Sequence, residues 1–582
     1  MSRIILNALR APKQVRLTKL ATTLTPSIEK SQSVQLYHPT NYVRSLSHRS
    51  YSTTNPKNNP SREIIVESPI EDIVVPNQNL VELVFDGMNE EILERPALTC
   101  GPTGRSYNYG MMRMLVTRFA EAALSHCRLK PGDTIGLLLP NIPEFVIVCH
   151  GAMEAGIYVT FLNPLYTPNE IKGQFQNADV KLIVTVPQLL DAAVGIGSGL
   201  SDYHGTICIG GDDDDSRNVF GLESLLRAGH EAELPEVKPE NLAVLPFSSG
   251  TTGVPKGVML SHYNLVANLF QVAHPDIAFE ASVDDPFVVF TVLPFFHIFG
   301  FNTILNSNLR MKMHLVTMPR FSPEDYIQAL ITYKPKMLFV VPSLMTFLTD
   351  NSNSYSLAER FKRKFGDQIN VRQGYGMTET SPVTHLSHQV APPTKHNTIG
   401  VPIPNTTARV VDLITGESLG PNKSGELQVK GPQVMMGYLK NEKATKETID
   451  EDGWLHTGDI VYYDDDKYFY VIDRCKELIK VKGNQVSPTE LEHILLEIPE
   501  VVDAAVVGVP DALADEVPKA FIVKKAGSEI TVESISKYVN ERVVHYKKLA
   551  GGIVFLESIP RNPSGKILRN ELKTNESKYV KK

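Results

Sequence analysis

The sequence contains no uninterrupted apolar run long enough to cross a membrane. Its longest apolar stretch, from Phe145 to Leu162, is interrupted by His150, Glu154 and two glycines. A membrane-spanning helix needs about 20 consecutive, predominantly apolar residues. We therefore expect no transmembrane segment in this chain.

Cysteine is scarce, and its pattern is typical of neither a disulfide framework nor a zinc site. The 582 residues include five cysteines, an odd number, widely spaced and without a C-x-x-C motif: Cys100, Cys127, Cys149, Cys208 and Cys475. We expect reduced thiols that serve as small core side chains.

Acidic side chains are nearly missing from the first part of the sequence. Residues 1–60 hold nine lysines and arginines but a single acid, Glu29. A basic segment rich in serine and threonine is typical of an organellar transit peptide. Within it, Arg49-Ser50-Tyr51-Ser52 resembles a mitochondrial processing site. We expect residues 1–60 to be a transit peptide or a disordered extension, with a mitochondrial location; a cytoplasmic location is the alternative.

The rest of the chain is acidic, with 49 basic and 64 acidic side chains and a net charge of −15. This charge argues against nucleic acid as a partner and leaves small molecules as the expected ones. A hydrophobic content of 42% and a charged content of 21% are ordinary for a soluble globular protein. The length exceeds that of one compact domain, so we expect more than one.

From about residue 62, short apolar runs alternate with amphipathic segments, which predicts parallel sheets covered by helices on both faces. The segment Asn141–Gly151 is an expected helix, and Ser322-Pro323-Glu324-Asp325 has the capping residues that open another. The expected strands are Thr134–Leu139, Tyr158–Leu162, Lys181–Val186, Gly205–Ile209, Leu242–Phe247, Pro286–Leu293, Met313–Met318 and Lys336–Val341.

The second half changes character. Runs at Thr407–Asp412 and Gly425–Lys430, joined by turn residues, predict a small β-rich subdomain. After Asp473 the pattern becomes compact α+β, with a capping box, Ser487-Pro488-Thr489-Glu490, at the start of a helix. The expected strands Val501–Val509 and Lys519–Lys524 and the expected helix Thr531–Val543 follow. The fold class is thus α/β, with a large N-terminal domain and a small α+β C-terminal domain.

One string is built to hold a polyphosphate: Ser248-Ser249-Gly250-Thr251-Thr252-Gly253-Val254-Pro255-Lys256-Gly257. Its glycines allow backbone amides to approach an anion, while its hydroxyls and lysine add donors and charge. It is not a Walker A loop, because no serine or threonine follows Lys256. A flexible connector is the structural alternative for such a string.

Five further strings follow in order: Pro294–Gly300, Gln373–Glu379, Gly453–Asp459, Lys480–Gln485 and Pro563–Arg569. Together with the first, they resemble the signature motifs of the adenylate-forming superfamily of acyl-CoA synthetases, 4-coumarate–CoA ligases and luciferases. The resemblance covers roughly residues 65 to 570 and is greatest to 4-coumarate–CoA ligase-like proteins. It implies domains at 61–472 and 477–572, a hinge at 473–476 and a tail at 573–582.

The resemblance implies a site for ATP, Mg²⁺ and coenzyme A. Lys566 would act in adenylation and Lys480 in thioester formation, Glu379 would bind the metal, and Lys476 would occupy the hinge. The implied ATP- or AMP-binding residues are Ser248, Ser249, Gly250, Thr251, Thr252, Gly253, Lys256, Gln373, Gly374, Tyr375, Gly376, Thr378, Asp459, Arg474, Lys476 and Lys566. The implied coenzyme A contacts are Arg320, Lys482, Gly483 and Gln485.

The acyl pocket implied by the resemblance is lined by His297, Phe299 and Thr303. Phe299 stands where coumarate ligases commonly have a tyrosine, which removes a hydroxyl that could address a phenolic ring. The only tryptophan, Trp454, belongs to another motif, so it does not shorten the pocket as a tryptophan does in acetyl-CoA synthetases. We expect a roomy pocket that accepts medium-chain acids and uses cinnamate about as well as 4-coumarate.

The sequence departs from the family pattern at one place. No S-G-G-A-P-L string occurs between Val341-Pro342 and Gln373, although that segment normally supplies a wall of the acyl pocket and contacts to the adenylate. We therefore expect an ATP-dependent acid–CoA ligase acting on a hydroxycinnamate-like or medium-chain acid. The alternatives are a medium-chain fatty acyl-CoA ligase, a luciferase-type oxygenase, or a nucleotide-binding paralogue with reduced activity.

Overall fold

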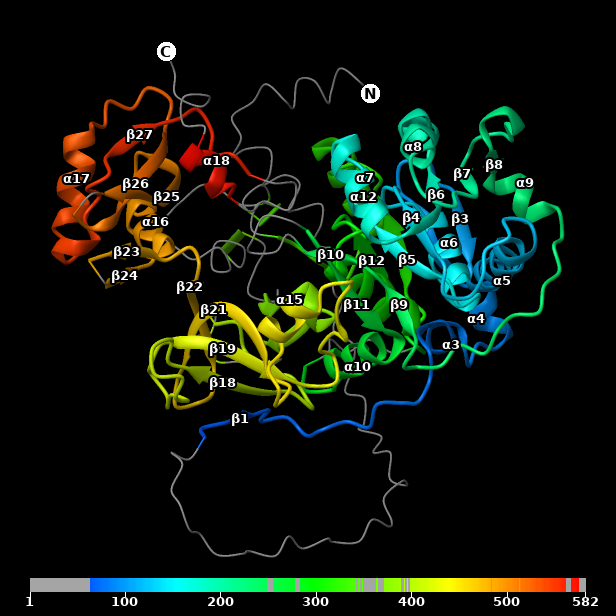
Figure 1. Ribbon diagram of the computed structural model, residues 1–582, viewed down its shortest axis with the longest axis horizontal. Helices are drawn as coiled ribbons and strands as arrows, with labels where there is room; N and C mark the ends of the chain where they lie inside the picture. Colours follow the sequence, from blue (N-terminus) through cyan, green and yellow to red (C-terminus); the bar gives the residue numbers. More distant parts are fainter. Residues whose placement is uncertain are drawn as a thin grey trace, which may run out of the picture. The chain divides into compact units, whose positions relative to one another are not determined.

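The computed structural model describes residues 63–248, 255–277, 283–341, 344, 345, 348, 363, 364, 371–388, 392, 395, 398–482, 484–511, 513–561 and 567–574. Their strands form five sheets with helices between and around them, which confirms the predicted α/β class (Figure 1). The expected segments 1–60, 573–582 and the Lys566 loop lie wholly or partly outside these residues, and the domain boundaries stay predictions. Among the described residues, no helix is long and apolar enough to cross a membrane.

The largest sheet has the order β10-β11-β9-β5-β4-β6-β7-β8, with β20 (Gly437–Tyr438) paired to β11. From β9 to β8 its neighbours are parallel, as predicted. The strands are β4 (Thr134–Leu137), β5 (Tyr158–Phe161), β6 (Val180–Thr185), β7 (Gly205–Cys208), β8 (Val219–Gly221), β9 (Leu242–Val244), β10 (Phe247–Ser248) and β11 (Lys256–Ser261). Their apolar side chains are buried on both faces, which explains the continuous apolar runs.

A second sheet has the order β14-β12-β13-β2-β3, parallel except for the β2–β3 pair. Its strands are β2 (Pro96–Cys100), β3 (Ser106–Asn108), β12 (Val288–Thr291), β13 (His314–Thr317) and β14 (Met337–Leu338). One apolar core contains side chains from this sheet, from the largest sheet and from the helices α5, α6 and α10. The helix α6 (Glu144–Glu154) is buried all round, as expected for a helix between two sheets.

The other helices before residue 460 cover these sheets or connect their strands (Figure 1). They are α3 (Leu80–Phe85), α4 (Glu90–Glu94), α5 (Tyr109–Ser125), α7 (Pro168–Asn177), α8 (Leu190–Gly197), α9 (Leu222–Arg227), α10 (His262–Val272), α11 (Ser307–Arg310), α12 (Pro323–Tyr333) and α15 (Glu442–Thr448). Ser322 caps α12 by accepting a hydrogen bond from the Asp325 amide, as its sequence predicts.

The predicted β-rich region is an antiparallel sheet of order β1-β18-β19-β21-β22, beside a small sheet of β15, β16 and β17. Its strands are β1 (Val66–Glu67), β18 (Thr407–Val411), β19 (Gly425–Lys430), β21 (Leu455–Tyr463) and β22 (Phe469–Arg474). The small sheet comprises β15 (Gly374–Gly376), β16 (Val383–Leu386) and β17 (Val401–Pro402). These two sheets position the motif strings Gln373–Glu379 and Gly453–Asp459.

The C-terminal part has a sheet of order β24-β23-β26-β25, with β27 paired to β26, and a core of its own. Its elements are β23 (Ile479–Val481), β24 (Asn484–Val486), α16 (Pro488–Leu496), β25 (Val501–Asp511), β26 (Asp515–Lys524), α17 (Val532–Asn540), β27 (Ile553–Phe555) and α18 (Arg569–Thr574). Ser487 caps α16 as predicted, but the Glu490 carboxylate pairs with Lys547, so the capping box forms only on its serine side.

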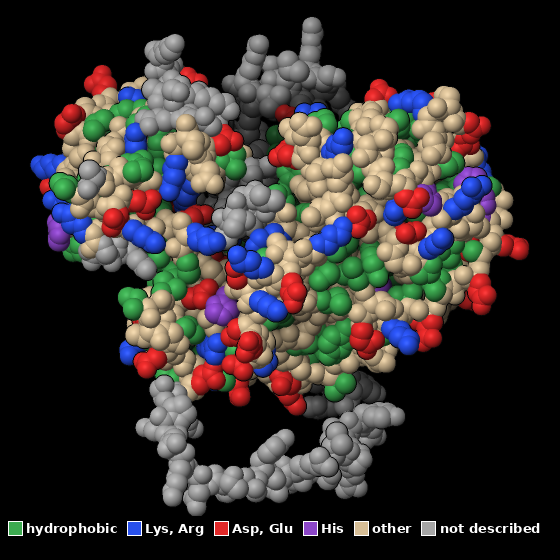
Figure 2. All heavy atoms as spheres, in the orientation of Figure 1, with side chains coloured by type: hydrophobic (Ala, Val, Ile, Leu, Met, Phe, Trp, Pro, Cys, Tyr) green, Lys and Arg blue, Asp and Glu red, His purple; other side chains and the backbone are tan. Residues whose placement is uncertain are grey.

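All five cysteines are unpaired, four of them buried and Cys475 half-buried. In the described part of the chain, no group of three or more His, Cys, Asp or Glu side chains is arranged to hold a metal. The visible face carries lysine and arginine side chains interspersed with acidic ones (Figure 2).

Candidate active site

The string Ser248–Gly257, predicted to bind a polyphosphate, begins and ends on two paired strands. Strands β10 and β11 are antiparallel, and Ser248 pairs with Lys256 at the point where the chain leaves and re-enters the sheet. The residues between them that were predicted to bind phosphate, Ser249, Gly250, Thr251, Thr252 and Gly253, lie outside the described residues. Both ends of the string are thus held at one edge of the largest sheet.

Lys256 and Glu379 meet at one tyrosine, Tyr438. The Tyr438 hydroxyl donates a 2.8 Å hydrogen bond to Glu379 Oε1, and Lys256 Nζ lies 4.7 Å from the centre of the Tyr438 ring. Tyr438 is placed there because β20 pairs with β11, with Val258 opposite Tyr438. Burial, and then the charge of Glu379, raise the pKa of Tyr438, so it is a neutral donor. The structure therefore brings the predicted metal ligand to the base of the polyphosphate loop.

The Glu379 carboxylate suits a hard cation. Its side chain is buried, and a carboxylate has two oxygens with several lone pairs, so the Tyr438 bond leaves acceptor capacity. Mg²⁺ typically takes one or two protein carboxylates and completes its octahedral shell with water and substrate phosphates. Glu379 would hold Mg²⁺, which would neutralise phosphate charge.

A second cluster joins the Gln373–Glu379 string to the Gly453–Asp459 string. The Tyr375 hydroxyl donates to Asp459 Oδ2 at 2.5 Å, and Arg474 Nε lies 3.2 Å from Asp459 Oδ1. Asp459 and Arg474 are direct partners in the β21–β22 ladder. Burial and the Asp459 charge raise the pKa of Tyr375 well above its usual value, so it stays protonated. Asp459 is therefore a buried, oriented acceptor with an arginine beside it.

The glycines of the Gln373–Glu379 string allow a close backbone approach. A Cβ atom at Gly376 would lie 1.9 Å from the Pro382 carbonyl oxygen, so only glycine fits there. Gln373 and Gly374 are exposed at the start of the string, and Thr378 is half-buried in a turn beside the buried Glu379. The string consequently forms β15 and the start of the turn that leads to its antiparallel partner β16, with Thr378 and Glu379 in that turn.

His297, Phe299 and Thr303 lie in or just before the π-helix η3 (Phe299–Asn306). The His297 imidazole is exposed, and desolvation by the surrounding protein lowers its pKa. The Phe299 ring packs edge-on against Phe339, 6.0 Å between centres. The Thr303 hydroxyl oxygen is buried without a hydrogen-bond partner in the described part of the chain.

Asn302 connects this acyl segment to the nucleotide segment, and sequence reasoning missed it. Its Nδ2 donates 2.7 Å to the Ser381 carbonyl, just after the Glu379 string, and 3.1 Å to the Leu265 carbonyl on α10. Tyr438 was missed in the same way. Neither residue belongs to a motif string, and only their long-range hydrogen bonds show that they contact residues in or next to the string Gln373–Glu379.

Three of the residues predicted in the C-terminal part, Lys480, Lys482 and Gln485, lie on the hairpin of β23 and β24. Lys480 is exposed on β23, with its amide donating to Glu516, and it pairs across the ladder with Gln485 on β24. Lys482 is exposed at the turn between the two strands, in the left-handed region at φ 48°. Gly483 and Lys566 lie outside the described residues. Lys476 is exposed after β22, and Arg320 is exposed between β13 and α12.

This geometry coincides with two family matches. The AMP-binding enzyme family matches residues 88–439, and the AMP-binding enzyme C-terminal domain matches residues 490–566. The chain therefore belongs to the AMP-binding enzymes, the adenylate-forming acid–CoA ligase family. The predicted family is confirmed.

Individual proteins of this family are similar to the chain over most of its length. Similarity to 4-coumarate–CoA ligase 1 of Arabidopsis thaliana is 36% identity over 549 residues, 89% of this chain and 96% of that protein. Among solved structures, ATP-bound MatB of Rhodopseudomonas palustris is 25% identical, with a TM-score of 0.75, covering 86% of this chain and 99% of that one. The o-succinylbenzoate CoA synthetase of Bacillus subtilis, bound to its acyl-adenylate, is 26% identical, with a TM-score of 0.72, covering 86% and 98%.

Proposed function

We propose that this chain is an ATP-dependent acid–CoA ligase acting on a hydroxycinnamate-like or medium-chain carboxylic acid. The observation that carries the proposal is the Tyr375–Asp459–Arg474 cluster, in which a buried carboxylate is oriented to accept hydrogen bonds from both ribose hydroxyls of ATP. The Glu379–Tyr438–Lys256 cluster would receive the phosphates and Mg²⁺.

The reaction has two half-reactions. In the first, a carboxylate oxygen of the acid attacks the α-phosphorus of ATP, and pyrophosphate leaves. In the second, the coenzyme A thiol loses its proton and attacks the acyl carbon, and AMP leaves. Negative charge develops at phosphorus in the first step, and a lysine opposes it electrostatically. Lys566 would supply that cation, and the Lys480–Gln485 hairpin would serve the second half-reaction.

The substrate class rests on the acyl segment. Phe299 offers an apolar ring, which favours aliphatic chains and unsubstituted rings, and each buried methylene should contribute about 0.8 kcal/mol until the pocket is full. The Thr303 hydroxyl, buried without a described partner, is a polar group in the predicted lining that could address a phenolic hydroxyl. The relatives named 4-coumarate–CoA ligases support including hydroxycinnamates in this class.

The test is ATP–pyrophosphate exchange driven by a panel of acids. We expect kcat/KM to rise from acetate through medium-chain acids, and cinnamate to be used about as well as 4-coumarate. A strong preference for 4-coumarate that disappears in Thr303→Val would instead assign Thr303 as the phenol donor. Exchange with no acid of the panel would favour the nucleotide-binding paralogue, and light emission dependent on oxygen would favour a luciferase-type enzyme.

We also propose that the chain is imported into mitochondria and cleaved near Tyr51. The acid-poor composition of residues 1–60 and Arg49-Ser50-Tyr51-Ser52 support this proposal. N-terminal sequencing of the protein from its own cells should begin near Ser52. Recovery of an intact N-terminus from those cells would contradict it.

A further inference from the structure

The loop that contains Lys566 is closed at its base. Arg561 and Ile567 form an antiparallel bridge, and the Leu568 amide donates a 2.9 Å hydrogen bond to the Pro560 carbonyl. The described residues on the two sides of 562–566 therefore form one short two-stranded stem. This stem is the described structure from which the Lys566 segment extends.

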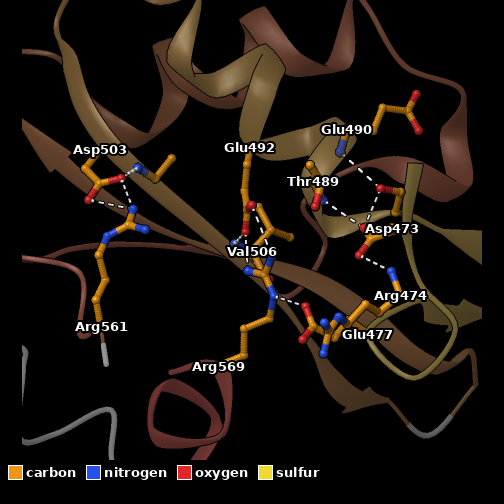
Figure 3. Close-up of polar contacts among 12 residues, drawn as sticks. Asp473, Arg474, Glu477, Thr489, Glu490, Glu492, Asp503, Val506, Arg561 and Arg569 are labelled. Carbon is orange, nitrogen blue, oxygen red and sulfur yellow. Dashed lines mark hydrogen bonds and ion pairs between the residues drawn. The ribbon is translucent and has the colours of Figure 1, made fainter. Parts of the chain in front are cut away.

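The C-terminal side of the stem leads directly into Arg569, the first residue of α18. Its guanidinium donates to both carboxylate oxygens of Glu492 on α16, to Glu477 Oε2 at 2.7 Å and to the Val506 carbonyl at 3.4 Å (Figure 3). The Arg569 side chain is only 14% exposed, and that of Glu492 only 10%. Burial alone would lower the pKa of Arg569, but Glu492 and Glu477 together raise it.

The N-terminal side of the stem is held by a second arginine. Arg561 Nη2 donates to both carboxylate oxygens of Asp503, at 2.9 and 3.1 Å (Figure 3). Asp503 and Val506 are both on β25, so the two arginines fasten the two sides of the stem to one strand. The Arg561 pair is more exposed, at 38% and 29%, and should contribute less than the Arg569 cluster.

Glu477 connects this cluster to the predicted hinge. It follows Lys476 directly in the sequence, and its carboxylate binds Arg569, 92 residues further along the chain. The stem of the Lys566 loop is therefore fastened to the first residue past the hinge. A flexible lysine that must reach a reacting phosphate gains most from such a fixed base, because small misplacements are costly in rate.

We propose that Arg569, held by Glu492 and Glu477, is a positioning residue that sets the Lys566 loop for adenylation. This proposal rests on the function proposed above, in which Lys566 acts in the first half-reaction. Arginine suits the role because its planar fork makes bidentate bonds in a fixed geometry, whereas lysine is a single point charge. Lys480 lies on a different strand of the same sheet, so the second half-reaction should be largely spared.

The test compares Arg569→Ala, Arg569→Lys and Glu492→Gln with the wild-type full-length enzyme. ATP–pyrophosphate exchange should fall about 10- to 100-fold in Arg569→Ala and by less in the two milder variants. Conversion of supplied acyl-adenylate to thioester should change by about twofold or less. Guanidinium ion at non-denaturing concentration should restore part of the exchange of Arg569→Ala and none of that of Lys566→Ala.

Lys547→Ala is the matched control, because Lys547 also pairs with a glutamate of α16, Glu490, but away from the stem. It should leave both half-reactions near wild type. Equal losses in both half-reactions for the milder Arg569→Lys and Glu492→Gln, or unchanged exchange in all three variants, would overturn the positioning role. Wild-type enzyme without exchange, or a Lys566→Ala variant with full exchange, would overturn the function proposed above instead, and the positioning role with it.

Discussion

The strands that carry Asp459 and those that carry Lys480 differ in how their functional side chains are held. Asp459 is buried, and both of its oxygens meet donors on other elements. Lys480 is exposed on β23, and Lys482 is exposed at a turn. The predicted nucleotide-binding end is thus held by contacts within the protein, whereas the lysines have the reach of flexible side chains.

This difference has a physical reason. A carboxylate that must hold two ribose hydroxyls benefits from being fixed in advance, because ordering it on binding would weaken affinity. A cation needed in one half-reaction only is better carried on a segment whose position can change, as the hinge at residues 473–476 would allow. In the positioning role proposed above, Arg569 would give Lys566 a fixed base.

The largest expected effect is the loss of one half-reaction when one of two lysines, Lys566 or Lys480, is replaced by alanine. Lys566→Ala should lower ATP–pyrophosphate exchange about 100- to 1,000-fold, since it removes a charge that opposes the developing phosphate charge. It should still convert supplied acyl-adenylate to thioester. Lys480→Ala should show the reverse pattern. Equal loss of both half-reactions in both variants would show that Lys566 and Lys480 do not serve separate half-reactions.

The next effect concerns the fixed end of the site. Asp459→Asn keeps the shape but removes the charge that Tyr375 and Arg474 orient, so the KM for ATP should rise about 10- to 100-fold. Steady-state kinetics with varied ATP measure it. Asp464→Asn is the control, because Asp464 pairs with Lys395 just beyond the same strand. An unchanged KM for ATP would show that Asp459 does not hold the ribose.

A smaller effect is expected at Glu379. Tyr438→Phe removes the hydroxyl that orients this carboxylate, and loss of such a supporting bond should raise the Mg²⁺ concentration for half-maximal exchange about tenfold. Tyr470→Phe, which removes a similar bond to Asp464, should leave the Mg²⁺ requirement as it is. The same Mg²⁺ requirement in Tyr438→Phe and wild type would count against Glu379 as the metal ligand.

Sequence patterns predicted most of the parallel strands, because side chains buried on both faces leave continuous apolar runs, but they missed β2 and β8. They failed at β11, whose residues Lys256–Ser261 follow the polyphosphate string and were not predicted as a strand. That strand exists because it pairs with β9, β10 and β20, and the last of these lies about 180 residues away in the chain. Pairing over such a distance overrides local preference.

The same reason separates the predicted site residues from the missed ones. Tyr375, Asp459, Arg474 and Glu379 were found because they belong to recognisable motif strings, and the structure brings them together in two clusters. Tyr438 and Asn302 make long-range hydrogen bonds, which leave no local pattern in the sequence. At Ser487 the predicted cap formed, but Glu490 found a stronger partner in Lys547, 57 residues later.

The smallest expected effect is a pH dependence in the part of strand β21 just before Asp459. His456 Nδ1 lies 3.0 Å from Glu426 Oε2, and the other oxygen of Glu426 accepts a hydrogen bond from the Gly458 amide at 3.1 Å. The hydrogen bond to Glu426, together with the charges of Glu426 and Asp450, raises the pKa of His456 despite partial burial. Protonated His456 therefore supports the start of strand β21, which carries Asp459.

The sign of this effect follows from the raised pKa. The folded protein binds the proton more tightly than the unfolded chain, so the contribution of His456 is fully present below the ordinary histidine pKa of about 6.5 and is lost as pH rises through the raised value. Because the pair is partly exposed, it should be worth only about 0.2–1 kcal/mol. Wild type should unfold about 1 °C above His456→Asn at pH 6 and at the same temperature at pH 9. If the difference in unfolding temperature between wild type and His456→Asn grew with pH, neutral His456 would be the form that stabilises the start of β21.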